Sequence, residues 1–206
     1  GHRRAHRRSR RGWWLAHPRS ALPRPEHPPL SGCPLPPIAT RDTIPLQSPV
    51  PSGLALPAVS GAKVTPLAGF SVEARVLGLE PYSLGREAEY SPVDLAVGWG
   101  RMRDDAVLDR LGFRHGGRFF RYRWEGQPPI PQHEIIRSVA NMHIVPANDE
   151  VTAALKRVRI GQQVRVDGWL VRIDAADGWH WRSSLTREDD GNGACELVYT
   201  CAITPR

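Results

Sequence analysis

The chain has 206 residues, of which 28 are basic, 21 are acidic and 40% are hydrophobic. This length suffices for one domain of ordinary size and excludes a large multidomain machine. The 19 glycines follow no triplet period and there are only three cysteines, which excludes a collagen-like fibre and a disulfide-dense miniprotein. The apolar stretches run for only a handful of residues, so none of them is long enough to span a bilayer.

The positive charge is concentrated near the N-terminus. Residues 1–41 contain nine arginines and a single acidic residue, Glu26, which gives this segment a net charge of +8. The other residues together carry −1, because the whole chain has a net charge of +7. A nearly neutral body lacks the electrostatic footprint of a dedicated nucleic-acid-binding domain. We therefore expect no nucleic-acid partner for the folded part, although the basic segment could associate with nucleic acid or an anionic membrane.

Residues 1–61 are predicted to be an unfolded tail, and residues 62–206 a single domain. Thirteen of the 20 prolines lie at or before Pro66, and the tail has neither a helical nor a strand period. Such a segment buries too little apolar surface to offset the entropy lost on ordering. A run starting at Ser9 imitates a twin-arginine export signal, but Pro18 interrupts the apolar core that should follow.

The three cysteines do not form a recognisable motif. Cys195 and Cys201 lie in one predicted strand, where six residues span about 20 Å, which is far beyond disulfide reach. Cys33 lies in the predicted tail. There is no CxxC or CxxH spacing, so the sequence supports neither a redox motif nor a zinc finger, and we expect no metal or cofactor.

The first part of the domain is predicted to mix strands and short helices. Residues 70–76 alternate between apolar and polar side chains, as in a half-buried strand. A helix is predicted from Ser91 to Gly98, because Ser91 suits the N-cap and Pro92 the first helical position. A short helix over residues 104–110 and a strand over residues 120–124 follow.

The second part is predicted to end in a three-stranded antiparallel meander. Before it come a helix over residues 133–140, an extended run over 142–145, and a helix that is capped by Asn148 or Asp149 and ends at Gly161. The meander strands are expected over residues 163–173, 179–186 and 195–204. Several short helices segregated from a mostly antiparallel sheet indicate an α+β domain. The meander could curve into a small partly open barrel, with a bulge at Gly168.

Two histidines near the third predicted helix are the first candidates for chemistry. His133 with Glu134, and Asn141 with His143, could supply metal ligands or a general base. The spacing is wrong for an HExxH motif. The alternative, which we favour, is that His143 begins a buried strand and has a structural hydrogen bond.

A polar stripe on a later strand is the second candidate site. On a strand over residues 179–186, His180, Arg182 and Ser184 face the side opposite Trp179 and Trp181. An imidazole, a guanidinium and a hydroxyl in a row suit an anionic or sugar-like ligand. The aromatic side would then anchor the core. A merely solvent-exposed polar face is the equally weighted alternative.

Two further patterns have simpler interpretations. Residues 189–192 hold two aspartates and an asparagine around a glycine, but they lack the ligand pattern of an EF-hand and are predicted to form a hairpin turn. Residues 114–124 interleave arginines with aromatic residues, a pattern that can stack on nucleotides. For this neutral body we favour an ordinary amphipathic edge strand.

Three stretches of the domain resemble a family of uncharacterised small bacterial proteins. They are residues 91–100 (SPVDLAVGWG), residues 140–147 (ANMHIVPA), and residues 177–197, which include DGWHWRSSLTR and GACEL. The resemblance implies a cell-envelope location, with a hydrophobic segment before the domain, but it implies no activity or catalytic residue. The N-terminal segment of this chain is instead rich in arginine and proline, and a complete chain of this kind would be cytoplasmic.

We therefore expect a non-catalytic binding or accessory domain whose partner is a protein or a small anionic ligand. Its expected ligand surface comprises Trp99, Asn141, His143, His180, Arg182 and Ser184. Asn141 and Ser184 would form hydrogen bonds, Arg182 would contact an anion, and Trp99 would provide aromatic packing. The alternatives are a hydrolase that uses His143 or His180 as a base, with or without a metal, and nucleic-acid association through the basic tail.

Overall fold

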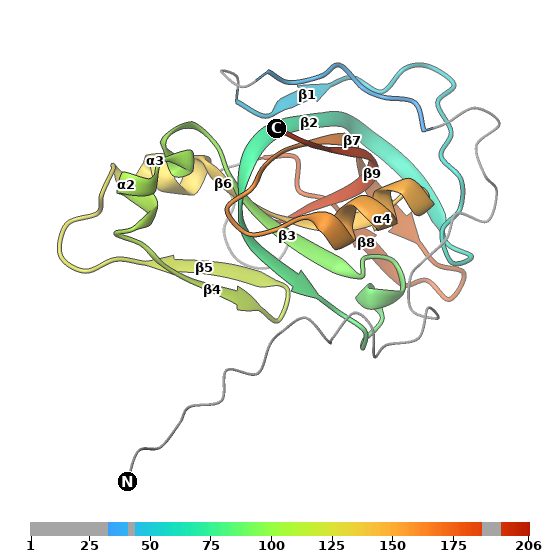
Figure 1. The fold of residues 1–206 in the computed structure, drawn as a ribbon. Helices are drawn as coiled ribbons and strands as arrows, with labels where there is room; N and C mark the ends of the chain where they lie inside the picture. Colours follow the sequence, from blue (N-terminus) through green and yellow to red (C-terminus); the bar gives the residue numbers. More distant parts are fainter. Residues whose placement is uncertain (1–32, 41–43, 187–194) are drawn as a thin grey trace, which may run out of the picture.

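The computed structural model describes residues 33–40, 44–186 and 195–206 (Figure 1). The predicted α+β class is confirmed, because a mostly antiparallel sheet is combined with short helices. Within the described residues, no helix is both long and apolar enough to cross a membrane. The twin-arginine-like run and the predicted turn at residues 189–192 lie outside the described residues.

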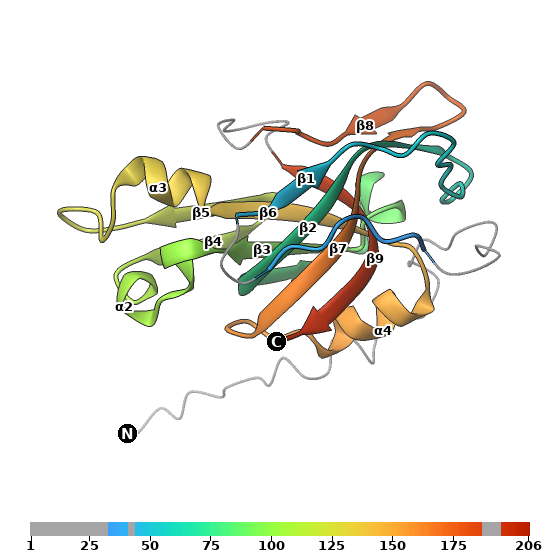
Figure 2. The same ribbon diagram turned by 90° about the horizontal axis from the view of Figure 1, so that it is seen from above.

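The main sheet has seven strands, and a separate hairpin lies beside it. In sheet order, the seven are β1 (Leu46–Ser48), β2 (Lys63–Pro81), β3 (Val93–Gly98), β6 (Val139–Pro146), β9 (Glu196–Pro205), β7 (Gln163–Asp174) and β8 (His180–Arg182). The hairpin consists of β4 (Gly112–Gly116) and β5 (Phe119–Arg123). It projects from the ring on the same side as helices α2 (Asp105–Leu108) and α3 (Gln132–Arg137), as Figures 1 and 2 show.

Five of the strands pair in a ring-like order, from β2 through β3, β6, β9 and β7 back to β2. Strand β2 reaches both of its ring neighbours because it is 19 residues long and has register irregularities. Only the β6–β9 pair is parallel. With helix α4 (Asp149–Arg157) between β6 and β7, this is the strand order of an OB-fold, which is a partly open five-stranded Greek-key barrel. The sheet here is partly ring-like.

The main hydrophobic core fills the inside of the ring, because alternate residues of each strand point inward. Helix α4 lies across the ring in Figure 1 and contributes Val151 and Leu155 to this core. Its N-cap is Asn148, one of the two predicted candidates, and the Asn148 side chain accepts a hydrogen bond from the Val151 N–H at 3.0 Å. Strands β3 and β6 contribute inward-pointing residues to the same core, namely Val93, Leu95 and Val97 on β3 and Met142 and Ile144 on β6.

The predicted bulge at Gly168 is confirmed. The register between β7 and β9 shifts between Asp167 and Gly168. A Cβ atom at position 168 would lie 2.2 Å from the Tyr199 carbonyl oxygen, so only glycine allows the two backbones to approach this closely. The bulge bends β7 and helps the sheet to curve.

Two predicted elements are wrong. Residues 91–98 do not form a helix, because Val93–Gly98 is a fully buried strand. The cap signature at Ser91 and Pro92 is overridden by the burial of Val93, Leu95 and Val97, which favours a strand in the middle of a sheet. The C-terminal strands do not form a meander either, since β7 lies between β8 and β9 in the sheet, and β8 is only His180–Arg182.

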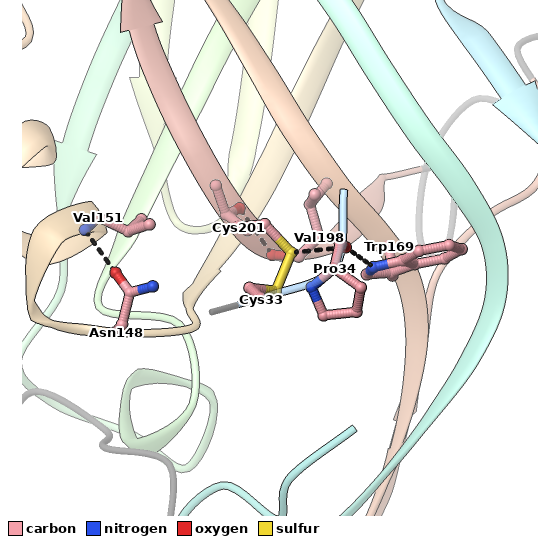
Figure 3. Close-up of a disulfide and its surroundings, with 8 residues drawn as sticks. Cys33, Pro34, Asn148, Val151, Trp169, Val198 and Cys201 are labelled. Atoms are coloured by element: carbon pink, nitrogen blue, oxygen red, sulfur yellow. Dashed lines mark hydrogen bonds between the residues drawn. A yellow bond between two sulfur atoms is a disulfide. The ribbon is translucent and has the colours of Figure 1, made fainter. Parts of the chain in front are cut away.

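Part of the predicted tail is folded onto the ring. Residues 44–61 include β1, which pairs with β2, and Cys33 forms a disulfide with Cys201 on β9 (Figure 3). The Pro34 carbonyl accepts a hydrogen bond from the Trp169 indole at 2.8 Å. The expectation that residues 33–40 and 44–61 are unfolded is therefore wrong. Their many prolines follow an extended path in which the sheet, rather than local periodicity, supplies the partners.

Candidate functional site

A buried carboxylate lies at the centre of the candidate site. Asp94 is on β3, where Val93 and Leu95 point into the ring core, so its own side chain points to the outer face. His143 of β6 is its direct neighbour across the sheet. Asp94 has no exposed surface and His143 has very little. A buried charge of this kind needs partners, because losing its hydration without them costs several kcal/mol.

Three side chains surround the Asp94 carboxylate. His143 Nδ1 lies 2.8 Å from Oδ1, and the Arg118 guanidinium donates to the same oxygen at 2.7 Å. The Asn141 amide lies 3.5 Å from Oδ2. An ionised carboxylate can only accept hydrogen bonds, so the bonding pattern assigns the proton of this contact to His143 Nδ1. The charge of Asp94 is therefore balanced by Arg118, and its side chain is fixed in position.

Arg118 reaches this carboxylate from the tip of the β4–β5 hairpin. Its backbone has φ of +68°, which is unusual for a residue other than glycine. The Arg118 N–H donates to the Tyr82 hydroxyl at 2.8 Å, and its guanidinium lies 3.8 Å from the centre of the Tyr82 ring. The guanidinium also donates to the Ser91 carbonyl at 2.8 Å. These contacts hold the strained residue in place and attach the hairpin to the ring.

A second hairpin residue, His115, continues the network. His115 Nε2 lies 2.9 Å from Asn141 Oδ1, and the Asn141 amide donates to the Arg118 carbonyl at 3.0 Å. His115 Nδ1 is buried and has no hydrogen-bond partner among the residues that the structure describes. Burial lowers the pKa of His115 below its ordinary value, because the charged ring would lose its hydration. Asn141 thus connects the β6 face to both hairpin residues.

Aromatic rings and a free thiol complete the surroundings. The Trp181 ring centre lies 4.8 Å from that of His143 and 5.7 Å from the Arg118 guanidinium. The Cys195 thiol lies 3.9 Å from the Arg118 carbonyl. Burial, followed by the charge of Glu196, raises the pKa of Cys195 to about 11. The thiol is therefore protonated at neutral pH and is a weak nucleophile.

The structure brings some of the sequence-predicted site residues together and separates others. Asn141 and His143 both belong to the buried network. His180 and Arg182 are exposed on β8, on either side of Trp181. Ser184 is buried, and its hydroxyl is bonded to the backbone of Thr186. Trp99 is also buried and packs in the ring core, so its ring is unsuited to the ligand surface expected for it.

Sequence reasoning missed Asp94, His115, Arg118 and Cys195. Asp94 was hidden by the apparent helix cap, although an acidic residue between Val93 and Leu95 is also the pattern of a strand with one polar outward position. The two glycines before Arg118 indicated a turn, but nothing local indicated that its side chain would meet Asp94. The position of Asp94 beside His143 depends on the pairing of β3 with β6, which are distant in the sequence.

The described residues contain no group of three or more His, Cys, Asp or Glu side chains that could hold a metal ion. The network instead offers hydrogen bonds and one balanced pair of opposite charges, Asp94 and Arg118. The resemblance to small bacterial proteins stays a prediction. No known protein family, curated protein or solved structure matches the chain.

Proposed function

We propose that the chain is a non-catalytic binding domain that takes an anionic ligand at β8, beside Trp181. The observation that carries this proposal is the position of Trp181. Its ring packs on His143 of the buried network, while its sequence neighbours His180 and Arg182 are exposed. His180 and Arg182 point to the face of β8 opposite Trp181, so the packed ring fixes the strand while the imidazole and the guanidinium on its accessible face suit an anionic ligand.

The strand topology also favours a ligand site at β8. In OB-folds the ligand lies against the second and third ring strands and the loops between strands one and two and strands four and five. In this chain those strands are β3 and β6, and the second of those loops contains β8. The first loop contributes Tyr82 to the network and Tyr90, whose ring stacks on Trp179 at 5.2 Å.

Arg182 is the cation best suited to contact the anion. It lies opposite Arg172 across the β7–β8 pair, and Arg172 already has a carboxylate partner in Asp174 at 2.8 Å. No carboxylate among the described residues lies within ion-pair distance of Arg182. Arg172 and Arg182 therefore place two positive charges opposite each other, and their repulsion lowers the stability of the strand pair. An anionic ligand on Arg182 would offset this repulsion.

The Asp94–His143 pair favours a hydrolase as the second candidate. A carboxylate on Nδ1 orients an imidazole as in hydrolases that use histidine as a general base. Two features support binding over hydrolysis. The His143 ring is covered by Trp181, and the neighbouring thiol of Cys195 has a raised pKa. The network then serves to position Trp181 and the hairpin.

Thermal melts with phosphate, sulfate, citrate and glucuronate test the proposal. A ligand at 100 times its Kd stabilises the folded state by about 2.7 kcal/mol, which raises Tm by several degrees for a domain of this size. We expect the shift to disappear in Arg182→Gln and to persist in Arg157→Gln, which removes another exposed arginine, on α4. A flat panel, or a shift that Arg182→Gln leaves unchanged, would contradict the proposal. Turnover of ester or phosphoester substrates that His143→Ala abolishes would favour the hydrolase.

A further inference from the structure

The β4–β5 hairpin has two chemically different faces. The register pairs Phe113 with Tyr122 and His115 with Phe120, and these side chains pack against the body of the molecule. The opposite face carries Arg114 directly across from Arg121, with Arg123 and Phe119 further along β5 on the same side. Figure 2 shows the hairpin extending away from the ring beside α2 and α3.

The outer face of the hairpin concentrates positive charge, and no acidic residue on the hairpin itself balances it. Residues 110–124 contain five arginines and no acidic residue. Arg114, Arg121 and Arg123 are exposed, and no carboxylate among the described residues pairs with them. The directly opposed Arg114 and Arg121 repel each other, which lowers the stability of the hairpin. The nearly neutral net charge of the body conceals this local cluster.

We infer that this outer face binds single-stranded nucleic acid, with its arginines on the phosphates. Arg121 and Arg123 are two strand positions apart, about 6.6 Å along the strand. A guanidinium can form two hydrogen bonds with one phosphate, which suits arginine better than lysine to this contact. The Arg121 guanidinium lies 5.1 Å from the Phe119 ring centre, so a cation and an aromatic ring form one continuous surface. Cations beside an aromatic platform are the elements of sequence-tolerant single-strand binding.

The hairpin is held firmly enough to serve as a binding platform. Arg118 and His115 attach it to Asp94 and Asn141 from the inner face. The glycines opposite Phe119 and Arg123 are Gly116 and Gly112, and the space in front of Gly116 is open. An anionic membrane is the less favoured partner, because membrane-surface binding needs a substantial apolar area and this face holds one half-buried ring. The inference does not depend on the ligand site at β8.

Fluorescence anisotropy with a labelled oligothymidylate measures binding of the full chain across a range of salt concentrations. The test variant is Arg114→Gln/Arg121→Gln. The matched control is Lys156→Gln/Arg157→Gln, which removes two equally exposed charges from the end of α4. Each lost phosphate contact lowers the slope of log K against log salt by about 0.7. We expect the test variant to lose about 1.4 from the slope, and to bind on the order of tenfold more weakly near 0.1 M salt. The control should keep the slope of the unmodified chain.

Three results would overturn the inference. The first is no binding by the unmodified chain. The second is an equal loss in both variants, which would mean that net charge or the basic N-terminal segment accounts for all the binding. The third is a test variant that keeps its oligonucleotide affinity but no longer binds vesicles of phosphatidylcholine and phosphatidylglycerol, which would identify a membrane surface. An unchanged or raised Tm of the test variant shows that any loss of binding is not unfolding, since removing the Arg114–Arg121 repulsion does not destabilise the hairpin.

Discussion

At the scale of single residues, Asp94 decides how the hairpin meets the ring. It is fully buried and accepts hydrogen bonds from His143 and Arg118. Removing one partner of a buried charge pair leaves the other charge buried and unpaired. The resulting loss in the free energy of unfolding is far larger than the net stabilisation that the intact pair provides. Asp94 is therefore both the most informative position to change and one where a conservative substitution has a large effect.

We expect Asp94→Asn to lower the free energy of unfolding by about 3 kcal/mol, as measured by urea denaturation. The variant keeps the size of the side chain but leaves Arg118, whose side chain is 17% exposed, without its anion. The control is Asp105→Asn, which breaks a 2.6 Å ion pair with Arg75 at a position where the Asp105 side chain is 76% exposed. That change should cost about 1 kcal/mol or less. Equal losses in the two variants would mean that Asp94 has no special role.

His115 is expected to make the fold sensitive to acid. Its pKa in the folded state is lowered, mainly by burial, so the unfolded chain binds the proton more readily. The free energy of unfolding should therefore fall as the pH drops below about 6.5, the pKa of the unfolded ring. Urea denaturation from pH 7.5 to 5.0 should show a smaller decline in His115→Gln than in the unmodified chain. His133→Gln, at an exposed position on α3, should leave the decline unchanged.

At the scale of elements, the segment before β2 is fixed to the ring at several points. The Cys33–Cys201 disulfide closes a sequence separation of 168 residues. The Ala39 N–H donates to the Ser71 hydroxyl at 2.7 Å, and that hydroxyl donates to Asp167 at 2.6 Å. These contacts join the segment to β2, β7 and β9. Figure 3 shows how close the disulfide lies to the hydrogen bond between Pro34 and Trp169.

We expect Cys33→Ser to lower the free energy of unfolding by about 2–5 kcal/mol, because the unfolded chain is no longer restrained by the cross-link. Thermal melts under oxidising conditions should show the loss, and reduction of the unmodified chain by dithiothreitol should reproduce it. Cys195→Ser is the control, because Cys195 is a free thiol. Reduction by dithiothreitol should lower the Tm of Cys195→Ser by the same amount as that of the unmodified chain. A melt of the unmodified chain that dithiothreitol leaves unchanged would argue against the disulfide.

At the scale of the whole molecule, closure of the ring depends on close contact between β7 and β9. The parallel β6–β9 pair and the antiparallel β7–β9 pair bring the last strand of the chain between two earlier ones. β9 can take this place only because the backbone at Gly168 approaches Tyr199 without an intervening side chain. The candidate site depends on this closure, because β9 places the residue before it, Cys195, at the edge of the buried network.

Gly168→Ala is expected to destabilise the fold by about 3 kcal/mol or more, because the added methyl group would meet a backbone carbonyl that cannot rotate away. Circular dichroism melts measure the effect. Gly53→Ala is the control, since Gly53 has φ of +79° but nothing within 4 Å of its added Cβ. It should cost only about 1–2 kcal/mol, the strain of a left-handed backbone. A small effect at Gly168 would mean that the ring tolerates a wider β7–β9 separation.

The sequence by itself determined the α+β class, a helix that begins at Asn148 or Asp149, the long strand β7 and the bulge at Gly168. These follow from periodicity and local backbone chemistry, which act over a few residues. The sequence also indicated Asn141 and His143 as candidate site residues, because an amide and an imidazole within an apolar run need buried partners. Only the tertiary structure decided the conformation of residues 91–98, the placement of residues 33–40 and 44–61, and the contact between Asp94 and Arg118. The physical reason is that burial between distant strands can outweigh a local cap worth about 1 kcal/mol, and the register of those strands is set by the whole sheet.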